Sequence, residues 1–201
     1  MNTTALRWLA RSLVVVAAAA LSTGCAGDAP VSPDGWSAKR AGAPAAGAAS
    51  AGGNRAVDLG ACQNLQVPAG SKLAFHVYAS GVQIYRWTGT SWAFVGPEAV
   101  LTADAGGNGV VGIHYGGPTW ESNSGSKVIG TLLQPCTPDP NAIPWLLLGA
   151  VRTEGPGIFE RVTFIQRVNT VGGNAPSSPG SFAGEEARVP YTTEYFFYRT
   201  K

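Results

Sequence analysis

Charged residues are scarce in this chain, and no run of basic residues occurs in it. Only 13% of the 201 residues are charged. Two of the 14 basic residues and none of the 12 acidic ones fall in the first 25 positions, so the remainder carries 12 of each sign. Proteins that bind nucleic acid draw much of their affinity from clustered Lys and Arg. The composition therefore predicts no nucleic-acid partner.

Histidine is nearly absent as well, since His76 and His114 are the only two in the chain. A metal site needs several His, Cys or carboxylate ligands at recognisable spacing, and the sequence offers no such set. A Gly-x-Ser-x-Gly nucleophile motif is also missing. The glycine-rich stretch 106–109 has no following helix or Lys and is predicted to be a turn rather than a phosphate loop. We expect no metal and no cofactor.

The first 25 residues have the pattern of an export signal. Arg7 and Arg11 precede the apolar run Leu13–Leu21. That run is too short to remain in a bilayer as a spanning helix, which needs about 20 residues. Small residues follow it and end at Cys25. A basic start, a short apolar run and small residues together predict a secretory signal over residues 1–25.

The end of this signal is similar to the bacterial lipobox, in which a cysteine is acylated and becomes the new N-terminus. Cys25 is therefore expected to carry lipid, and more than one acyl chain suffices for stable membrane anchoring. Ser22 stands where the lipobox has an aliphatic residue, so cleavage after Ala20, which would give a secreted protein, stays open. Ala26, in place of Asp, indicates the outer membrane, on its periplasmic or surface face, if the host is Gram-negative.

The remainder divides into a linker and one domain. Residues 26–57 are rich in Ala, Gly, Pro and Ser and lack apolar periodicity. Such a segment cannot bury enough surface to offset its ordering entropy, so we expect a disordered tether. Residues 58–201 have the size of a single domain. If Cys25 is acylated, Cys62 and Cys136 form the one pair left in an oxidising compartment, and we expect a disulfide, with two buried free thiols as the alternative.

Short β-branched and aromatic runs alternate with turn residues along this domain. Leu73–Ala79 alternates in polarity, Ser80-Gly81 is predicted to turn into Val82–Trp87, and Thr88–Thr90 is predicted to form a second hairpin turn. No stretch has a sustained helical period with caps. Further strands are expected at 91–95, 110–115, 127–133, 145–152, 161–169 and 191–198, with a long loop at 171–188. This pattern predicts an all-β antiparallel domain, either a β-sandwich or a small barrel-like fold.

Six ordered motifs are similar to one known family. They are Gly81–Tyr85, Trp92–Ala99, Gly112–Ser126, Ala142–Leu148, Ile165–Gly173 and Val189–Tyr198. Together they resemble the exported bacterial and fungal family catalogued as domain of unknown function 3455. The resemblance covers almost all of residues 62–198. It implies a fold and an export route but no reaction, because the family has no established activity.

The cysteines depart from the pattern of that family. The resemblance implies a Cys at the position of Trp87 and another near Ser178–Gly180, and both are missing here. The bridge usual in the family is therefore not expected. Cys62 and Cys136 are then the only candidates for a disulfide in the domain.

His114 and Glu121 are the candidate catalytic pair. A turn at Gly116–Pro118 is expected to bring them near each other. A Glu that orients a His with a pKa near 6.5 is a general-base arrangement, as a hydrolase or isomerase would use. The alternative is a buried ring that bonds to Glu121 or to backbone and holds the turn, since no nucleophile accompanies the pair.

Aromatic residues are numerous and suggest a binding surface. Tyr85 and Trp87 share a strand face with Gln83, because alternate residues of a strand align. Gln166 and Arg167 are polar in an apolar strand, so one of them is expected to face inward and bridge backbone groups or point into a pocket. The full set of candidate cleft residues is Gln83, Tyr85, His114, Tyr115, Trp120, Glu121, Trp145 and Gln166. Packing in the core is the alternative for most of the rings.

Three functions follow from these observations. The first is a non-enzymatic cell-envelope domain that binds a glycan, a lipid or a protein partner through an aromatic-lined cleft. The second is a hydrolase or isomerase that uses His114 and Glu121. The third is a purely structural surface protein. The first function is favoured, because the domain has many aromatic residues and no recognisable set of catalytic residues.

Overall fold

The computed structural model describes residues 57–200. The predicted export signal, the acylation site Cys25 and residues 26–56 of the predicted tether lie outside the described residues. Within residues 57–200, no helix is long and apolar enough to cross a membrane.

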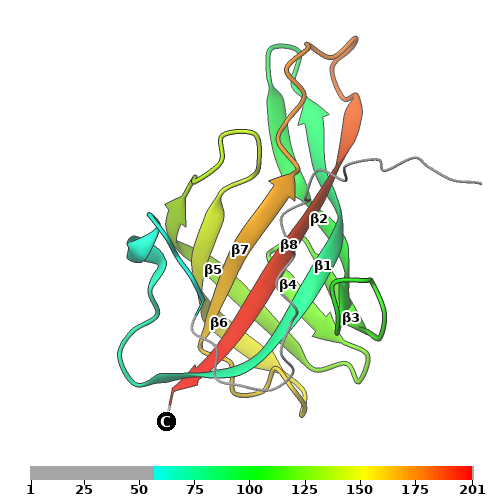
Figure 1. Cartoon of the computed structure of the whole chain (residues 1–201). Helices are drawn as coiled ribbons and strands as arrows, with labels where there is room; N and C mark the ends of the chain where they lie inside the picture. The colour runs from blue at the N-terminus through cyan, green and yellow to red at the C-terminus, as the bar shows by residue number, and fades with distance from the viewer. Residues whose placement is uncertain (1–56, 201) are drawn as a thin grey trace, which may run out of the picture. The chain divides into compact units, whose positions relative to one another are not determined.

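Eight strands follow one another in chain order and close into one antiparallel barrel, in which the last strand pairs with the first (Figure 1). A short 3-10 helix, η1 (Gln63–Leu65), precedes them. The strands are β1 (Ser71–Trp87), β2 (Trp92–Thr102), β3 (Val110–Tyr115), β4 (Thr119–Ser122), β5 (Lys127–Cys136), β6 (Trp145–Glu154), β7 (Phe164–Gly172) and β8 (Glu186–Thr200). The prediction of an all-β antiparallel domain is confirmed in its barrel-like form.

The longest strand, β1, continues through the position where the sequence predicts a turn. Gly81 lies within the β1–β2 ladder, and a Cβ built there would come within 2.0 Å of the carbonyl oxygen of Glu98. This glycine therefore permits a close approach of two strands and does not reverse the chain. The predicted turn at Ser80-Gly81 is wrong. The hairpin turn at 88–91 is confirmed, with Gly89 at φ +101°.

Aromatic rings close one end of the barrel. Phe197, near the end of β8, is fully buried and stacks on Phe75, near the start of β1, with 4.6 Å between ring centroids. Phe159 from the β6–β7 loop is only 1% exposed and lies 5.1 Å from the ring of Phe197. These three rings, the Phe159 plug, fill the interior at the end where β1 begins and β8 finishes.

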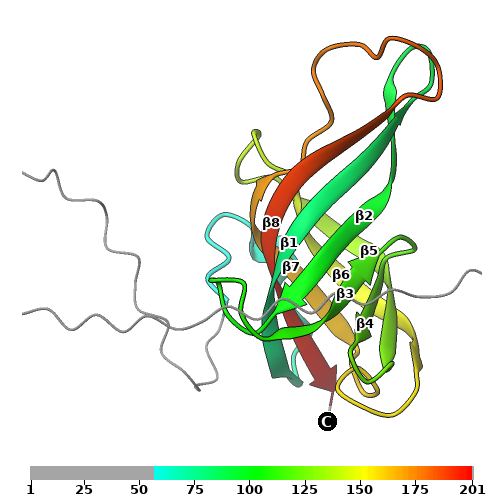
Figure 2. The same ribbon diagram turned by 90° about the vertical axis from the view of Figure 1, so that its right-hand side faces the viewer.

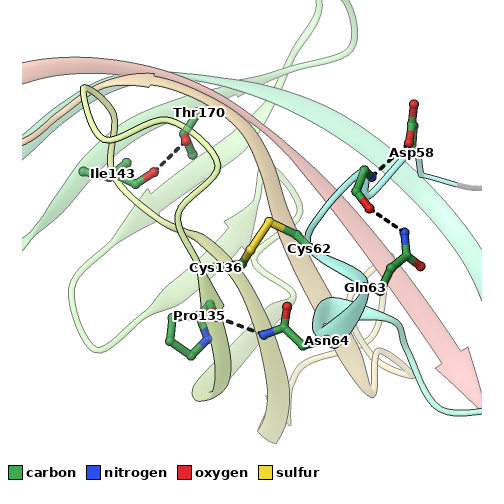
Figure 3. The surroundings of a disulfide bond; sticks show 9 residues. Asp58, Cys62, Gln63, Asn64, Pro135, Cys136, Ile143 and Thr170 are labelled. Atoms are coloured by element: carbon green, nitrogen blue, oxygen red, sulfur yellow. Dashed lines mark hydrogen bonds between the residues drawn. A yellow bond between two sulfur atoms is a disulfide. The ribbon is translucent and has the colours of Figure 1, made fainter.

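Residues 57–67, which we call the strap, cover the outer face of β6, β7 and β8. They share a buried cluster with those strands that includes Leu59, Leu65, Leu147, Val168, Phe196 and Tyr198. A disulfide between Cys62 and Cys136 fastens the strap to the end of β5 (Figure 3). Asn64 adds a side-chain hydrogen bond of 3.0 Å to the carbonyl oxygen of Pro135. The predicted Cys62–Cys136 bridge is thus confirmed.

The β1–β2 hairpin and the β7–β8 loop project together from the other end of the barrel (Figure 2). Trp87 packs against Gly180 so closely that a Cβ at position 180 would lie 2.6 Å from its Cγ. The indole nitrogen of Trp92 donates a hydrogen bond of 2.9 Å to the carbonyl oxygen of Ser178. Trp87 therefore stands at one position where the family resemblance implies a cysteine and packs near the other, and Trp92 bonds to the same loop.

Candidate functional site

A cavity of about 400 Å³ occupies the barrel end that lies opposite the Phe159 plug. Its walls come from all eight strands and from the loops that precede β4 and β6. Most of the lining is apolar, including Phe94, Pro97, Leu132, Leu146 and Leu148. Of the eight cleft residues predicted from the sequence, four line this cavity: Gln83, Tyr85, His114 and Trp120.

The first wall is the inward face of β1. Gln83 is 2% exposed, and its side-chain amide nitrogen has no hydrogen-bond partner. The hydroxyl of Tyr85 donates a hydrogen bond of 2.8 Å to the carbonyl oxygen of Gly173, at the start of the β7–β8 loop. Burial raises the pKa of Tyr85, and the charge of Arg167 opposes that shift in part. Gln83 and Tyr85 thus share a face that lines a cavity instead of forming an open platform, and Trp87 does not line this cavity.

The second wall is a stacked pair of rings from the β3–β4 hairpin. His114 and Trp120 are partners in the ladder, both are buried, and their ring centroids lie 4.4 Å apart. The Nδ1 atom of His114 is 2.9 Å from the carbonyl oxygen of Thr119, which can only accept, so Nδ1 carries the proton. Burial lowers the pKa of His114 to about 3, with a further contribution from the charge of Arg167. The ring is therefore neutral at pH 7, with its lone pair on Nε2.

Glu121 lies on the opposite face of the same hairpin. Its ladder partner is Ile113, and its carboxylate accepts a hydrogen bond of 2.8 Å from Tyr115 and lies 3.3 Å from the ammonium of Lys127. The Tyr115 hydrogen bond and the Lys127 charge lower the pKa of Glu121. Neighbouring residues of a strand point to opposite faces, so the predicted approach of Glu121 to His114 is wrong. Tyr115 and Glu121 form an exterior pair outside the cavity.

Two other predicted cleft residues lie outside the barrel, under the strap. Gln166 donates a hydrogen bond of 2.7 Å to the carbonyl oxygen of Leu65 and accepts one of 2.6 Å from the hydroxyl of Tyr198. Trp145 packs against the same buried cluster. Gln166 is thus the bridging residue, and its neighbour Arg167 is the one that reaches the cavity. Neither Gln166 nor Trp145 lines the cavity that contains His114 and Trp120.

Arg167 contributes the cationic group of the cavity. Its Nε and one Nη donate hydrogen bonds of 3.1 and 2.8 Å to the carbonyl oxygen of Pro144, in the loop before β6. The hydroxyl of Tyr195 is buried near the guanidinium without a hydrogen bond of regular geometry, and burial raises its pKa. Strand alternation could have predicted that Arg167 faces the barrel interior. Ile165 belongs to the barrel core, and residue 167 shares its face of the strand.

The groups that line this cavity determine the chemistry that it can offer. A general base works best with a pKa near the operating pH, and His114 is far below that range. Within the described part of the chain, no three His, Cys, Asp or Glu side chains gather closely enough to hold a metal ion. Tyrosines whose pKa is raised by burial remain neutral hydrogen-bond donors. The cavity therefore offers apolar surface, uncharged donors and one cation.

A family model described as protein of unknown function (DUF3455) matches residues 68–199. The match spans more than half of the chain and covers every strand that lines the cavity. No curated protein and no solved structure matches the sequence.

Proposed function

The chain belongs to the family described as protein of unknown function (DUF3455), and we propose that its barrel binds a small, largely apolar ligand. The observation that carries the proposal is the cavity of about 400 Å³ opposite the Phe159 plug. Small-molecule sites are usually concave and mostly apolar, with a few polar groups, and measure about 300–1,000 Å³. Eight-stranded barrels have an interior of the size that holds one small ligand.

Binding without turnover fits the side chains of this cavity better than catalysis. The proposed hydrolase or isomerase needs a base, and Glu121 does not share a face with His114. A purely structural role makes no use of a lined cavity. The two alternatives therefore have less support than a ligand-binding module.

The rim residue Phe94 gives a test of the cavity. Phe94 is 57% exposed and lines the cavity, so its truncation removes ligand contact without opening the core. We expect Phe94→Ala to weaken binding of the neutral dye Nile red about 5-fold. Losing about 40 Å² of apolar contact costs about 1 kcal/mol, which corresponds to that factor. A fluorescence titration measures it.

The matched control is Phe182→Ala. Phe182 is 66% exposed and does not line the cavity, so this variant is expected to bind the dye as the wild type does. Indistinguishable affinities of the wild type and Phe94→Ala, or no saturable binding by the wild type, would contradict the cavity as a binding site.

We also propose that the domain is exported and anchored to a membrane by lipid on Cys25. The Cys62–Cys136 disulfide supports an oxidising, extracytoplasmic location. Mass spectrometry of the membrane fraction is expected to show an N-terminal, acylated Cys25. A mature N-terminus at Leu21 would refute the anchor and leave a secreted protein.

A further inference from the structure

Arg167 brings a positive charge to a mostly apolar cavity without a carboxylate to balance it. None of the residues that line the cavity is acidic. None of the ion pairs found within residues 57–200 involves Arg167. A cation in apolar surroundings is costly unless an anion pairs with it. The cavity is therefore electrostatically complementary to a ligand with negative charge.

The guanidinium is held in place and still has donors to offer. Two of its five N–H groups bond to the carbonyl oxygen of Pro144, and the other three are available to the neighbouring Tyr195 hydroxyl and to a ligand. A planar guanidinium with free N–H groups suits the two oxygens of a carboxylate, and such pairs are among the stronger hydrogen bonds in proteins. The loop before β6 thus orients Arg167 for recognition.

Buried donors around the same cavity also lack acceptors. The side-chain nitrogens of Gln83 and Trp120 are both buried, and neither has a hydrogen-bond partner. Each of these residues lines the cavity. Leaving a buried donor unpaired costs free energy, and such groups call for an occupant that accepts hydrogen bonds. Two donors beside one cation indicate oxygen acceptors on the ligand.

From these observations we propose that the cavity binds an amphiphilic carboxylic acid, with its carboxylate on Arg167 and its aliphatic or aromatic body against the apolar wall. This inference rests on the proposed ligand-binding function. A carboxylate carries one charge and matches the single cation of the lining. A phosphate dianion would leave one negative charge unbalanced in apolar surroundings, because His114 is uncharged.

The test compares three ligands that share an eight-carbon chain: octanoate, 1-octanol and octyl phosphate. Isothermal titration of the wild-type protein at pH 7 is expected to give octanoate an affinity about 10-fold or more above that of 1-octanol, because hydrogen bonds between charged partners are the stronger ones. In Arg167→Gln, the affinity for octanoate is expected to fall about 10-fold or more, while the affinity for 1-octanol is expected to change less than about 2-fold. Arg167→Lys keeps the charge and should restore part of the preference for octanoate.

Each outcome decides between the two proposals. If 1-octanol binds as tightly as octanoate, or if Arg167→Gln weakens both equally, the carboxylate inference fails and the cavity remains a binding site. Tighter binding of octyl phosphate than of octanoate overturns the carboxylate in favour of a phosphate. If none of the three ligands binds and Nile red does not bind either, the ligand-binding function fails as well. The wild-type comparison stands even if Arg167→Gln does not fold.

Discussion

Replacing Cys62 and Cys136 by alanine is expected to lower the free energy of unfolding by about 4 kcal/mol. The disulfide joins residues 74 positions apart, and the chain-entropy relation for a closed loop of that length gives this magnitude. The loop includes all of β1 to β5, so the cross-link restricts a large part of the unfolded chain. Urea unfolding of the wild type and of the double variant under oxidising conditions measures the difference.

Reduction provides the control for this prediction. Wild-type protein in a strong thiol reductant should have the stability of the double variant, while the double variant should not respond to the reductant. Hydrogen exchange should rise first in the strap, since Cys62 is its only covalent link to β5 in the described structure. A loss below about 1 kcal/mol, or a pair of free thiols in the oxidised protein, would contradict the cross-link as a main source of stability.

Acidification from pH 7.5 to pH 5 is expected to cost about 2 kcal/mol of stability through His114 alone. Burial holds the pKa of His114 at about 3 in the folded protein, against 6.5 for an unperturbed histidine. Between these two values the unfolded chain binds a proton that the folded chain does not. The contribution of His114 to the free energy of unfolding is therefore fully present above pH 6.5. It falls as the pH drops towards 3, by up to about 1.4 kcal/mol per pH unit. Urea unfolding at several pH values measures this slope.

Two histidine variants isolate this effect. In His114→Gln the slope above pH 5 should largely disappear, whereas His76→Gln should retain it. Measurements above pH 5 avoid the carboxylates of Glu98 and Glu121, whose pKa values are lowered by their partners. If the wild type and His114→Gln show the same slope, the buried neutral state of His114 is refuted.

Strand content and most turns follow from local sequence, because alternation and turn residues act over a few positions. The disulfide follows from counting cysteines. Which residues face each other depends on ladder register, which local patterns do not fix. Tyr115 pairs with Thr119, so Trp120 faces His114 and Glu121 falls one step further on, beside Ile113. That difference of one residue places Glu121 and His114 on opposite faces of the hairpin.

Gly81 shows a second limit of predicting structure from neighbouring residues in the sequence. A Ser-Gly dipeptide between two apolar runs is typical of a hairpin turn, but this glycine makes room for the backbone of β2. A side chain at this position would collide with β2, and the residues next to Gly81 in the sequence do not show that β2 lies there. The residues that line the cavity were only partly predictable for a similar reason. Gln166 and Arg167 are neighbours in the sequence and lie on opposite sides of the barrel wall, and local sequence does not show which side faces inward.

Ring closure of the barrel has a consequence for how copies of this protein behave when crowded. An open sheet ends in strands whose unpaired N–H and C=O groups can recruit a second chain, and many proteins guard such edges with charge. Beyond residue 25 this chain has equal numbers of acidic and basic residues, so mutual repulsion between copies is weak. Pairing β8 with β1 along their length leaves neither the first nor the last strand as a free edge. Closure thus gives a sparsely charged protein the resistance to edge-to-edge aggregation that other sheets obtain from surface charge.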